Sequence, residues 1–155
     1  MIKIIIDSNI LFSALLNTNS KIAGIIINGQ DFYDFYAPQY ARTEILNHRN
    51  KIKKIKKLND LEFLEIYELI FGYITVLNHS ILPKKDFEKA FEYCRNIDVD
   101  DTIFVGFSEY LNSKLWTGDK KLISCLIKMG FDKTLTTEEL FKDFIEKNKL
   151  ENKNM

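Results

Sequence analysis

The N-terminal stretch MIKIIIDSN (residues 1–9) places a short apolar run directly before an acidic residue. The run Ile2–Ile6 is rich in β-branched residues and apolar on both faces, which is typical of a central strand in a parallel sheet. Asp7 then stands at the carboxyl end of that strand, where open α/β sheets bind their ligands. Ser8 is a candidate N-cap for an apolar helix over Ile10–Leu16.

Outward from this stretch, short strands and helices alternate to the C-terminus. Hydrophobic patterns and turn residues predict further strands at Tyr33–Ala37, Tyr73–Leu77, Lys114–Thr117 and Lys133–Leu135. They predict further helices at Ser20–Asn28, Gln39–Lys57, Asp60–Gly72, Pro83–Asn96, Thr102–Leu111, Lys120–Met129 and Glu138–Lys147. This alternation predicts an α/β three-layer sandwich with a mostly parallel central sheet of about five strands. Without a linker or repeat, residues 1–147 are expected to form one domain and residues 148–155 a frayed tail.

Composition and charge define the class of protein but leave its partner open. The chain has 155 residues, of which 46% are hydrophobic and 13% aromatic, so it fits one globular domain with a substantial core. The 22 basic and 22 acidic residues balance each other. The overall field therefore predicts no binding of polyanions, and any contact with nucleic acid must be local.

Cysteine usage and hydropathy predict a soluble cytoplasmic protein. Cys94 and Cys125 lie in apolar helical segments without the spacing of a metal site or a redox pair, so we expect buried free thiols. Free thiols suit a reducing cytoplasm. The N-terminal apolar run is too short for a signal peptide, and no uninterrupted apolar stretch reaches the roughly 18 residues of a membrane span.

Four acidic side chains are the candidate catalytic residues: Asp7, Glu44, Asp101 and Asp119. Carboxylates brought together from separate segments repel one another, and unless some are protonated they need a cation between them. Asp7 alone could be a turn residue that ends a strand. Asn9 could hydrogen-bond a neighbouring carboxylate or a ligand water, or it could serve as a local cap.

Glu44 falls within the arc of an apolar helical stripe. The stripe recurs at spacings of four and three at Ala41, Ile45, His48, Ile52 and Ile55. An ionised carboxylate that faces inwards is costly unless it is paired or bound to a metal. Alternatively, Glu44 lies at the edge of the stripe and reaches solvent or pairs with a lysine. His48 is expected to be a core or partly exposed histidine rather than a ligand.

The segment NIDVDDT (residues 96–102) carries three acids just before an apolar helix. Acidic residues in a first helical turn interact favourably with the helix dipole, so any one of them could be a cap. Three acids within four positions exceed what a cap requires. Asp101 is the predicted ligand, and Asp98 and Asp100 are expected to cap the helix or support the ligand.

The segment WTGDKK (residues 116–121) follows the fourth predicted strand. Thr117 and Asp119 would present oxygens at the same sheet edge as Asp7, although an ordinary aspartate cap at a strand–helix junction explains Asp119 equally well. Lys120 and Lys121 could hold a phosphate, but an exposed pair of lysines at the helix cap is the favoured interpretation. The basic run over 49–57, which includes Lys54, is either a solvated helix face or a ridge that contacts the phosphates of a polynucleotide.

Together these elements resemble a PIN domain. The resemblance rests on the strand ending in Asp7-Ser-Asn, on Glu44 in the helix after the second strand, on Asp98-Val-Asp-Asp before a helix, and on LWTGDKKL (residues 115–122). It extends from Ile2 to about Phe144 and is closest to small prokaryotic single-domain ribonucleases of the VapC toxin type. One departure is Val99-Asp-Asp-Thr, where many relatives have proline and then a small residue after the aspartates.

The resemblance implies an endoribonuclease that depends on Mg²⁺ or Mn²⁺. The family's four acidic positions match Asp7, Glu44, Asp101 and Asp119, with the metal held by Asp7, Asp101 and Asp119. Asn9, Asp98 and Thr117 would support them. The resemblance further implies an RNA substrate, a small antitoxin partner and a homodimer.

Two other functions share some of these sequence features with the nuclease. A phosphoacceptor receiver domain also has acids at strand ends and binds Mg²⁺, but it needs two adjacent acids after the first strand and an acceptor aspartate after the third. Here Asp7 is followed by Ser8, and the third strand leads into Leu77-Asn-His. The second rival is a non-catalytic binding module that has kept the PIN fold.

Overall fold

Five parallel strands form the central sheet, in the order β3-β2-β1-β4-β5. The computed structural model describes residues 1–155. The strands are β1 (Ile2–Ile6), β2 (Tyr33–Pro38), β3 (Thr75–Leu77), β4 (Lys114–Trp116) and β5 (Thr134–Leu135). The predicted α/β fold with five strands is confirmed, and every strand pair is parallel.

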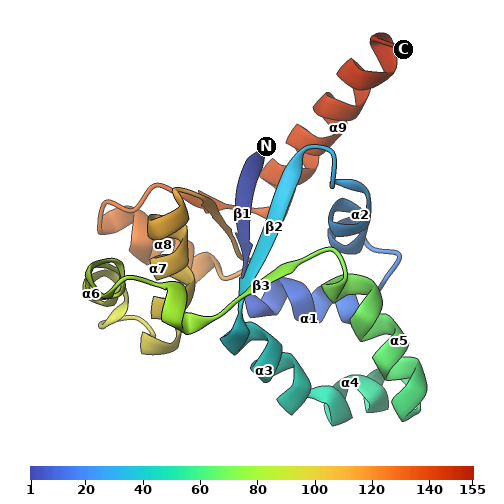
Figure 1. Cartoon of the computed structure of the whole chain (residues 1–155), viewed down its shortest axis with the longest axis horizontal. Helices are drawn as coiled ribbons and strands as arrows, with labels where there is room; N and C mark the ends of the chain where they lie inside the picture. Colours follow the sequence, from blue (N-terminus) through green and yellow to red (C-terminus); the bar gives the residue numbers. More distant parts are fainter.

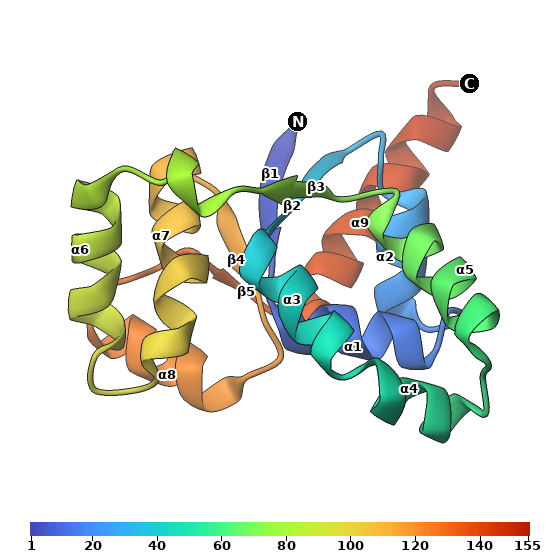
Figure 2. The same cartoon turned by 60° about the horizontal axis from the view of Figure 1, so that its bottom comes forward.

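Helices cover both faces of this sheet. They are α1 (Ser8–Leu16), α2 (Lys21–Asn28), α3 (Gln39–Asn47), α4 (Arg49–Lys56), α5 (Asp60–Phe71), α6 (Lys84–Cys94), α7 (Thr102–Leu111), α8 (Lys120–Lys128) and α9 (Thr137–Lys153). Two 3₁₀ turns, η1 (His79–Ile81) and η2 (Val99–Asp101), precede α6 and α7. Figures 1 and 2 show α6, α7 and α8 on one side of the sheet and α1, α2, α5 and α9 on the other. The three layers match the prediction.

The strand order reverses between β1 and β4. β2 and β3 extend the sheet on one side of this pair and β5 extends it on the other, so the connections diverge at the carboxyl ends of β1 and β4. The two strands are held together where they end, because the backbone amide of Asp7 donates to the carbonyl of Trp116 at 2.9 Å. In open α/β sheets such a divergence leaves a crevice that binds ligands. A ligand site is therefore expected among the residues that follow β1 and β4.

The core explains why the N-terminal run is a central strand. Ile4, Ile5 and Ile6 have no exposed surface, and neither has Trp116 on the neighbouring strand. A strand covered on both faces needs apolar residues at consecutive positions, and β-branched side chains pack well there. The Trp116 indole donates to the Thr137 hydroxyl at 3.0 Å, which ties β4 to the start of α9.

The predicted single helix over 39–57 is wrong, because the chain forms two helices, α3 and α4, that meet at His48. The His48 amide donates to the carbonyl of Glu44 at 3.1 Å and closes the last turn of α3. Asparagines near this junction have low helix propensity, which favours a break there. The predicted apolar stripe is broken in consequence: Ile52 is buried, whereas Ile55 is 53% exposed.

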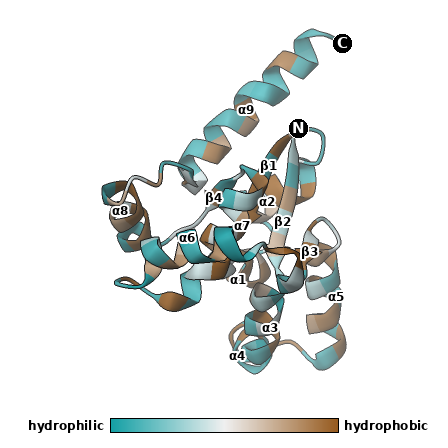
Figure 3. Ribbon diagram, turned by 60° about the vertical axis from the view of Figure 1, so that its left-hand side comes forward, coloured by the Kyte–Doolittle hydropathy of each residue, from teal (hydrophilic) through white to brown (hydrophobic).

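Helix α9 runs to Lys153 and not to the predicted end at 147, so most of the tail over 148–155 is helical rather than frayed. A capping box at Thr136 starts the helix, and an ion pair between Lys147 and Asp143 at 2.7 Å supports its middle. Once a helix is nucleated, each further residue adds a hydrogen bond at little cost. The part that projects beyond the sheet is mostly hydrophilic (Figure 3).

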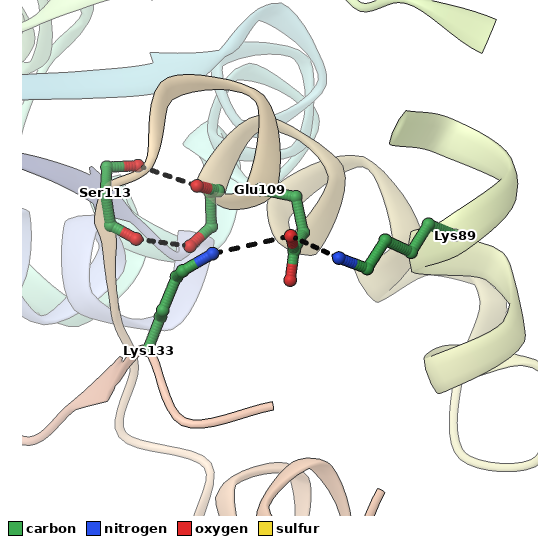
Figure 4. A network of polar contacts seen from close by, with 5 residues as sticks. Lys89, Glu109, Ser113 and Lys133 are labelled. Carbon is green, nitrogen blue, oxygen red and sulfur yellow. Dashed lines mark hydrogen bonds and ion pairs between the residues drawn. The ribbon is translucent and has the colours of Figure 1, made fainter. Parts of the chain in front are cut away.

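A polar network fixes the amino-terminal end of β4 (Figure 4). The Glu109 carboxylate on α7, only 9% exposed, accepts from Lys89 on α6 at 3.0 Å and from Lys133 before β5 at 3.4 Å. The Ser108 hydroxyl donates to the carbonyl of Ser113, the residue before β4. Because this network holds α6, α7 and the β5 entry together, it supports β4 at the end opposite Thr117.

No single helix in the structure is both long and apolar enough to cross a membrane. Helices α1 and α2 reach that length and composition only when taken together, and the chain bends by 102° between them.

Candidate active site

Asp7 lies at the point where β1 passes into α1. It is the N-cap of α1, so the predicted cap, Ser8, is instead the first residue of the helix. The Asp7 carboxylate is 6% exposed and accepts three hydrogen bonds: from the Ser8 amide at 2.7 Å, from the Thr117 hydroxyl at 2.7 Å and from the Asn9 side-chain amide at 3.2 Å. The strand end and the start of the helix together orient this carboxylate.

Thr117 and Asn9 join the ends of β1 and β4. The fully buried Thr117 hydroxyl donates to Asp7 and accepts from the Asp119 amide at 3.1 Å. The Asn9 side-chain carbonyl accepts from the Gly118 amide at 3.1 Å. The predicted supporting positions of Thr117 and Asn9 are therefore brought together around Asp7.

Glu44 reaches the same place from α3. Its half-buried carboxylate accepts from the Ser8 hydroxyl at 2.6 Å, and it forms no ion pair with a lysine. Its second oxygen makes no hydrogen bond within the protein. Ser8 is therefore a site residue that the sequence reasoning assigned to capping, although its place between Asp7 and Asn9 was a signal that could have revealed its role.

Asp101 precedes α7 and differs from the other acids. It occupies the N-cap position, but its half-buried carboxylate caps nothing and has no hydrogen-bond partner. Asp98, in contrast, caps η2 by accepting from the Asp100 amide at 2.9 Å. The expectation that Asp98 caps this segment is confirmed, and Asp101 is left with both oxygens free.

The carboxylates act on one another electrostatically. Burial and then the negative charges of Asp7, Asp98, Asp119 and Glu44 raise the pKa of Asp101 from 3.8 to about 7. Burial also raises the pKa of Asp7, against the hydrogen bonds from Thr117 and Ser8 that lower it. No lysine or arginine is among the main causes of either shift. The site therefore concentrates negative charge without a side-chain cation to balance it.

Asp119 and Tyr40 complete the surroundings. Asp119 is exposed and caps α8 by accepting from the Leu122 amide at 3.0 Å, so the capping interpretation is correct, but its charge also acts on Asp7 and Asp101. Tyr40, which the sequence reasoning missed, faces the same acids. Burial first, and then Glu44 and the aspartates of the 98–101 segment, raise the pKa of its phenol.

A divalent cation fits the chemistry of these donors, but the protein supplies few direct ligands for it. No three of the acidic side chains come close enough together to form a complete metal-binding cluster. The available donors are all carboxylate oxygens, which hard cations such as Mg²⁺ prefer, and Mg²⁺ usually keeps several waters and takes one or two carboxylates. The donors therefore fit an ion held by few direct ligands rather than one enclosed by the protein.

Comparisons with known proteins identify the family and the fold of the chain. A PIN-domain family model matches residues 5–145. The chain belongs to the PIN-domain family. The crystal structure of VapBC2 from Rickettsia felis bound to a DNA fragment from their promoter has a TM-score of 0.66 at 10% identity, and the match covers 87% of this chain and 98% of that one. At that identity the likeness shows a shared fold. No curated protein gives a significant match.

The structure shows where the two lysines that are predicted to bind RNA lie in this PIN domain. Lys120 is the first residue of α8, next to Asp119, and Lys54 lies on α4; both side chains are exposed and unpaired. His48, predicted to be core or partly exposed, is exposed. Neither lysine makes a hydrogen bond or an ion pair with a residue of the acidic group.

Replacing Thr117 by valine is expected to destabilise this PIN domain by about 1–3 kcal/mol. The substitution keeps the shape of the side chain, but the buried Asp7 carboxylate loses one of its three donors and the Asp119 amide loses its acceptor. Urea unfolding at neutral pH measures the change in the free energy of unfolding. Thr75→Val, at an exposed position on β3, is the matched control. Equal stability of both variants would show that the hydroxyl bridge contributes nothing.

Proposed function

We propose that this PIN-domain protein is a metal-dependent endoribonuclease that hydrolyses RNA phosphodiester bonds. The observation that carries the proposal is the convergence of carboxylates from four separate segments at one sheet edge, where no side-chain cation balances them and the pKa of Asp101 is raised to about 7. Structural ion pairing would supply a lysine or arginine. A site built to receive a divalent cation and a phosphate would leave that charge uncompensated.

Asp7 and Asp101 are the residues proposed to hold Mg²⁺ or Mn²⁺ directly, and Asp119 is proposed to hold it through one of the ion's waters. Asp101 has both oxygens free, and Asp119 has one oxygen free beyond its helix cap. Asp7 uses both oxygens in hydrogen bonds, which hold its carboxylate in one orientation. When bound, the metal would supply Lewis acidity towards the phosphate and a lowered pKa for its water.

The protein's own groups then position the reactants and move the proton. Ser8 holds Glu44 through one carboxylate oxygen and leaves the other oxygen free. In this proposal that free oxygen accepts a proton from a water that attacks the phosphorus, while the bond from phosphorus to the leaving 3′ oxygen breaks and that oxygen takes a proton from solvent. Thr117 and Asn9 keep the Asp7 carboxylate in one orientation, which limits the reorganisation needed during the reaction.

The receiver-domain alternative finds no support in the fold. Its acceptor aspartate would follow the third strand, but β3 is an edge strand here, and Asn78 after it caps η1. Doubly wound receiver sheets also have the strand order 2-1-3-4-5, unlike the order found here. The non-catalytic binding module is thus the alternative that an experiment must exclude.

A small antitoxin protein and a second copy of the chain are the proposed protein partners. The similar structure from Rickettsia felis is that of VapBC2 bound to promoter DNA, which supports a toxin–antitoxin context. An antitoxin that covers the acidic crevice would silence the nuclease, since RNA could no longer enter. The gene next to this one is the first place to look for it.

We expect purified protein to cut a labelled RNA pool in Mg²⁺ or Mn²⁺ and to leave it intact in EDTA. Mapping the cut ends gives the sequence preference. A calorimetric titration with Mn²⁺ distinguishes the nuclease from the non-catalytic binding module. If the protein is the nuclease, the native protein binds the ion. The variant that combines Asp7→Asn, Glu44→Gln, Asp101→Asn and Asp119→Asn does not bind it. A native protein that shows neither Mn²⁺ binding nor cleavage would favour the non-catalytic module.

A further inference from the structure

A cavity of about 380 Å³ lies next to the acidic side chains, between α1, α3 and the start of α4. Its lining includes Phe12, Ser13, Glu44, His48 and Lys51. Its volume lies within the range of sites for small molecules, about 300–1,000 Å³. Because Glu44 lines the cavity and also belongs to the acidic group, the cavity is continuous with the proposed site of hydrolysis.

Aromatic rings form one side of this cavity. The half-buried Phe12 ring meets the exposed His48 ring edge-on, with centroids 6.4 Å apart. The Lys51 ammonium lies over the Phe12 ring, 5.4 Å from its centroid. Lys51 is exposed and forms no ion pair, so its long side chain can swing away and leave the ring face open to another planar group. Aromatic faces of this kind stack with nucleobases.

Unpaired polar groups surround these rings. The Ser13 hydroxyl, the His48 imidazole and the second oxygen of Glu44 make no hydrogen bond within the protein. The Ser13 hydroxyl and the His48 imidazole can donate to and accept from the edge of a base. The α4 run over 49–57 continues outward with six cationic and no acidic residues, and only Lys53 among them is paired, with Asp60. A phosphate chain leaving the cavity would meet that surface.

We infer that this cavity binds one base of a single-stranded RNA next to the scissile phosphate, with the following phosphates on α4. The inference rests on the proposed function and names where its substrate is held. The base lies against Phe12 and His48, and Lys51 leaves the Phe12 ring to pair with a phosphate. Glu44 lies between the two places: its free oxygen takes the proton of the attacking water, and Ser13 and His48 meet the edge of the base.

Binding measured in EDTA tests this inference without any cleavage. The probes are a fluorescent, mixed-sequence single-stranded RNA 10-mer and a 10-mer of abasic ribose-phosphate units, and anisotropy gives both affinities. We expect native protein to prefer the RNA about tenfold, the size of one stacked base. His48→Ala and Phe12→Leu should each remove most of that preference. Phe12→Leu keeps an apolar group in the packing, and thermal unfolding checks that both variants are folded.

Replacing Lys51 should change the two binding affinities in a different way from replacing a ring. Lys51→Gln should weaken both probes alike and lower the salt dependence by about one charge, because it removes a phosphate contact and not a base contact. Lys149→Gln on the projecting end of α9 is the matched control and should change neither affinity. A native protein without a preference for the RNA, or a preference that survives in both ring variants, would overturn the inference.

The two proposals can fail separately. Protein that shows the base preference in EDTA but cuts no RNA in Mg²⁺ would refute the nuclease and keep the base site. Protein that cuts RNA, with binding unaffected by the ring variants, would keep the nuclease and refute the base site.

Discussion

Asp101→Asn should lower the rate of Mg²⁺-dependent RNA cleavage by at least about 10²-fold while the fold stays intact. Asparagine has nearly the shape of aspartate, but it removes the charge of the one acid in the site that has both oxygens free. The loss of a direct metal ligand removes several kcal/mol of transition-state stabilisation, and about 1.4 kcal/mol corresponds to a factor of ten in rate. Single-turnover cleavage with excess protein measures the rate.

Asp100→Asn is the matched control for that experiment. It removes the same charge one residue earlier, from an exposed side chain outside the proposed ligand set. Its cleavage rate should stay close to that of the native protein. Equal rates for native protein and Asp101→Asn would show that the reaction does not need this carboxylate, and the proposed ligand set would then be wrong.

The same Asp101→Asn variant is expected to be more stable than native protein when no metal is present. The pKa of Asp101 is raised from 3.8 to about 7 in the folded protein, so the folded state holds the proton more tightly than the unfolded state does. Its contribution to stability is therefore complete below about pH 4 and is lost as the pH rises towards 7. Above pH 7 the native protein carries a buried charge that the variant lacks.

At pH 8 in EDTA we expect a gain of about 1–2 kcal/mol for the variant. The full shift would correspond to about 4 kcal/mol at 1.36 kcal/mol per pKa unit, but solvent reaches the half-buried carboxyl and screens part of it. Urea unfolding at pH 4 and pH 8 measures the difference, which should vanish at the lower pH.

Mg²⁺ should stabilise native protein and leave the Asp101→Asn variant unchanged, since a ligand stabilises the state that binds it. A variant less stable than native protein at pH 8 would contradict the charge-repulsion account.

Much of the fold follows from local patterns in the sequence. The run Ile2–Ile6 predicts a central strand because it is apolar at consecutive positions, and a strand buried on both faces requires that. Asp7 and Thr117 could be placed at one sheet edge because parallel strands end together. That β1 and β4 are neighbours could not be predicted from local patterns, since the strand order depends on contacts between distant segments.

The contacts within the site were less predictable than its members. The Ser8 hydroxyl could have capped α1, and its bond to Glu44 depends on where α3 lies relative to α1. The stripe that contains Glu44 predicted one long helix, but the break at His48 is favoured by weak propensities that a periodic pattern hides. Tyr40 was missed because only the tertiary fold brings its phenol near the acids of the 98–101 segment.

The placement of the two chain ends has a practical consequence. The N-terminus enters β1, and α9 projects, at the end of the sheet away from the acids (Figure 1). With 17 residues, α9 is about 25 Å long and is itself a built-in spacer. A tag or a surface anchor attached at either terminus should therefore leave the acidic side chains accessible. Immobilised protein should therefore cut and bind RNA as the free protein does.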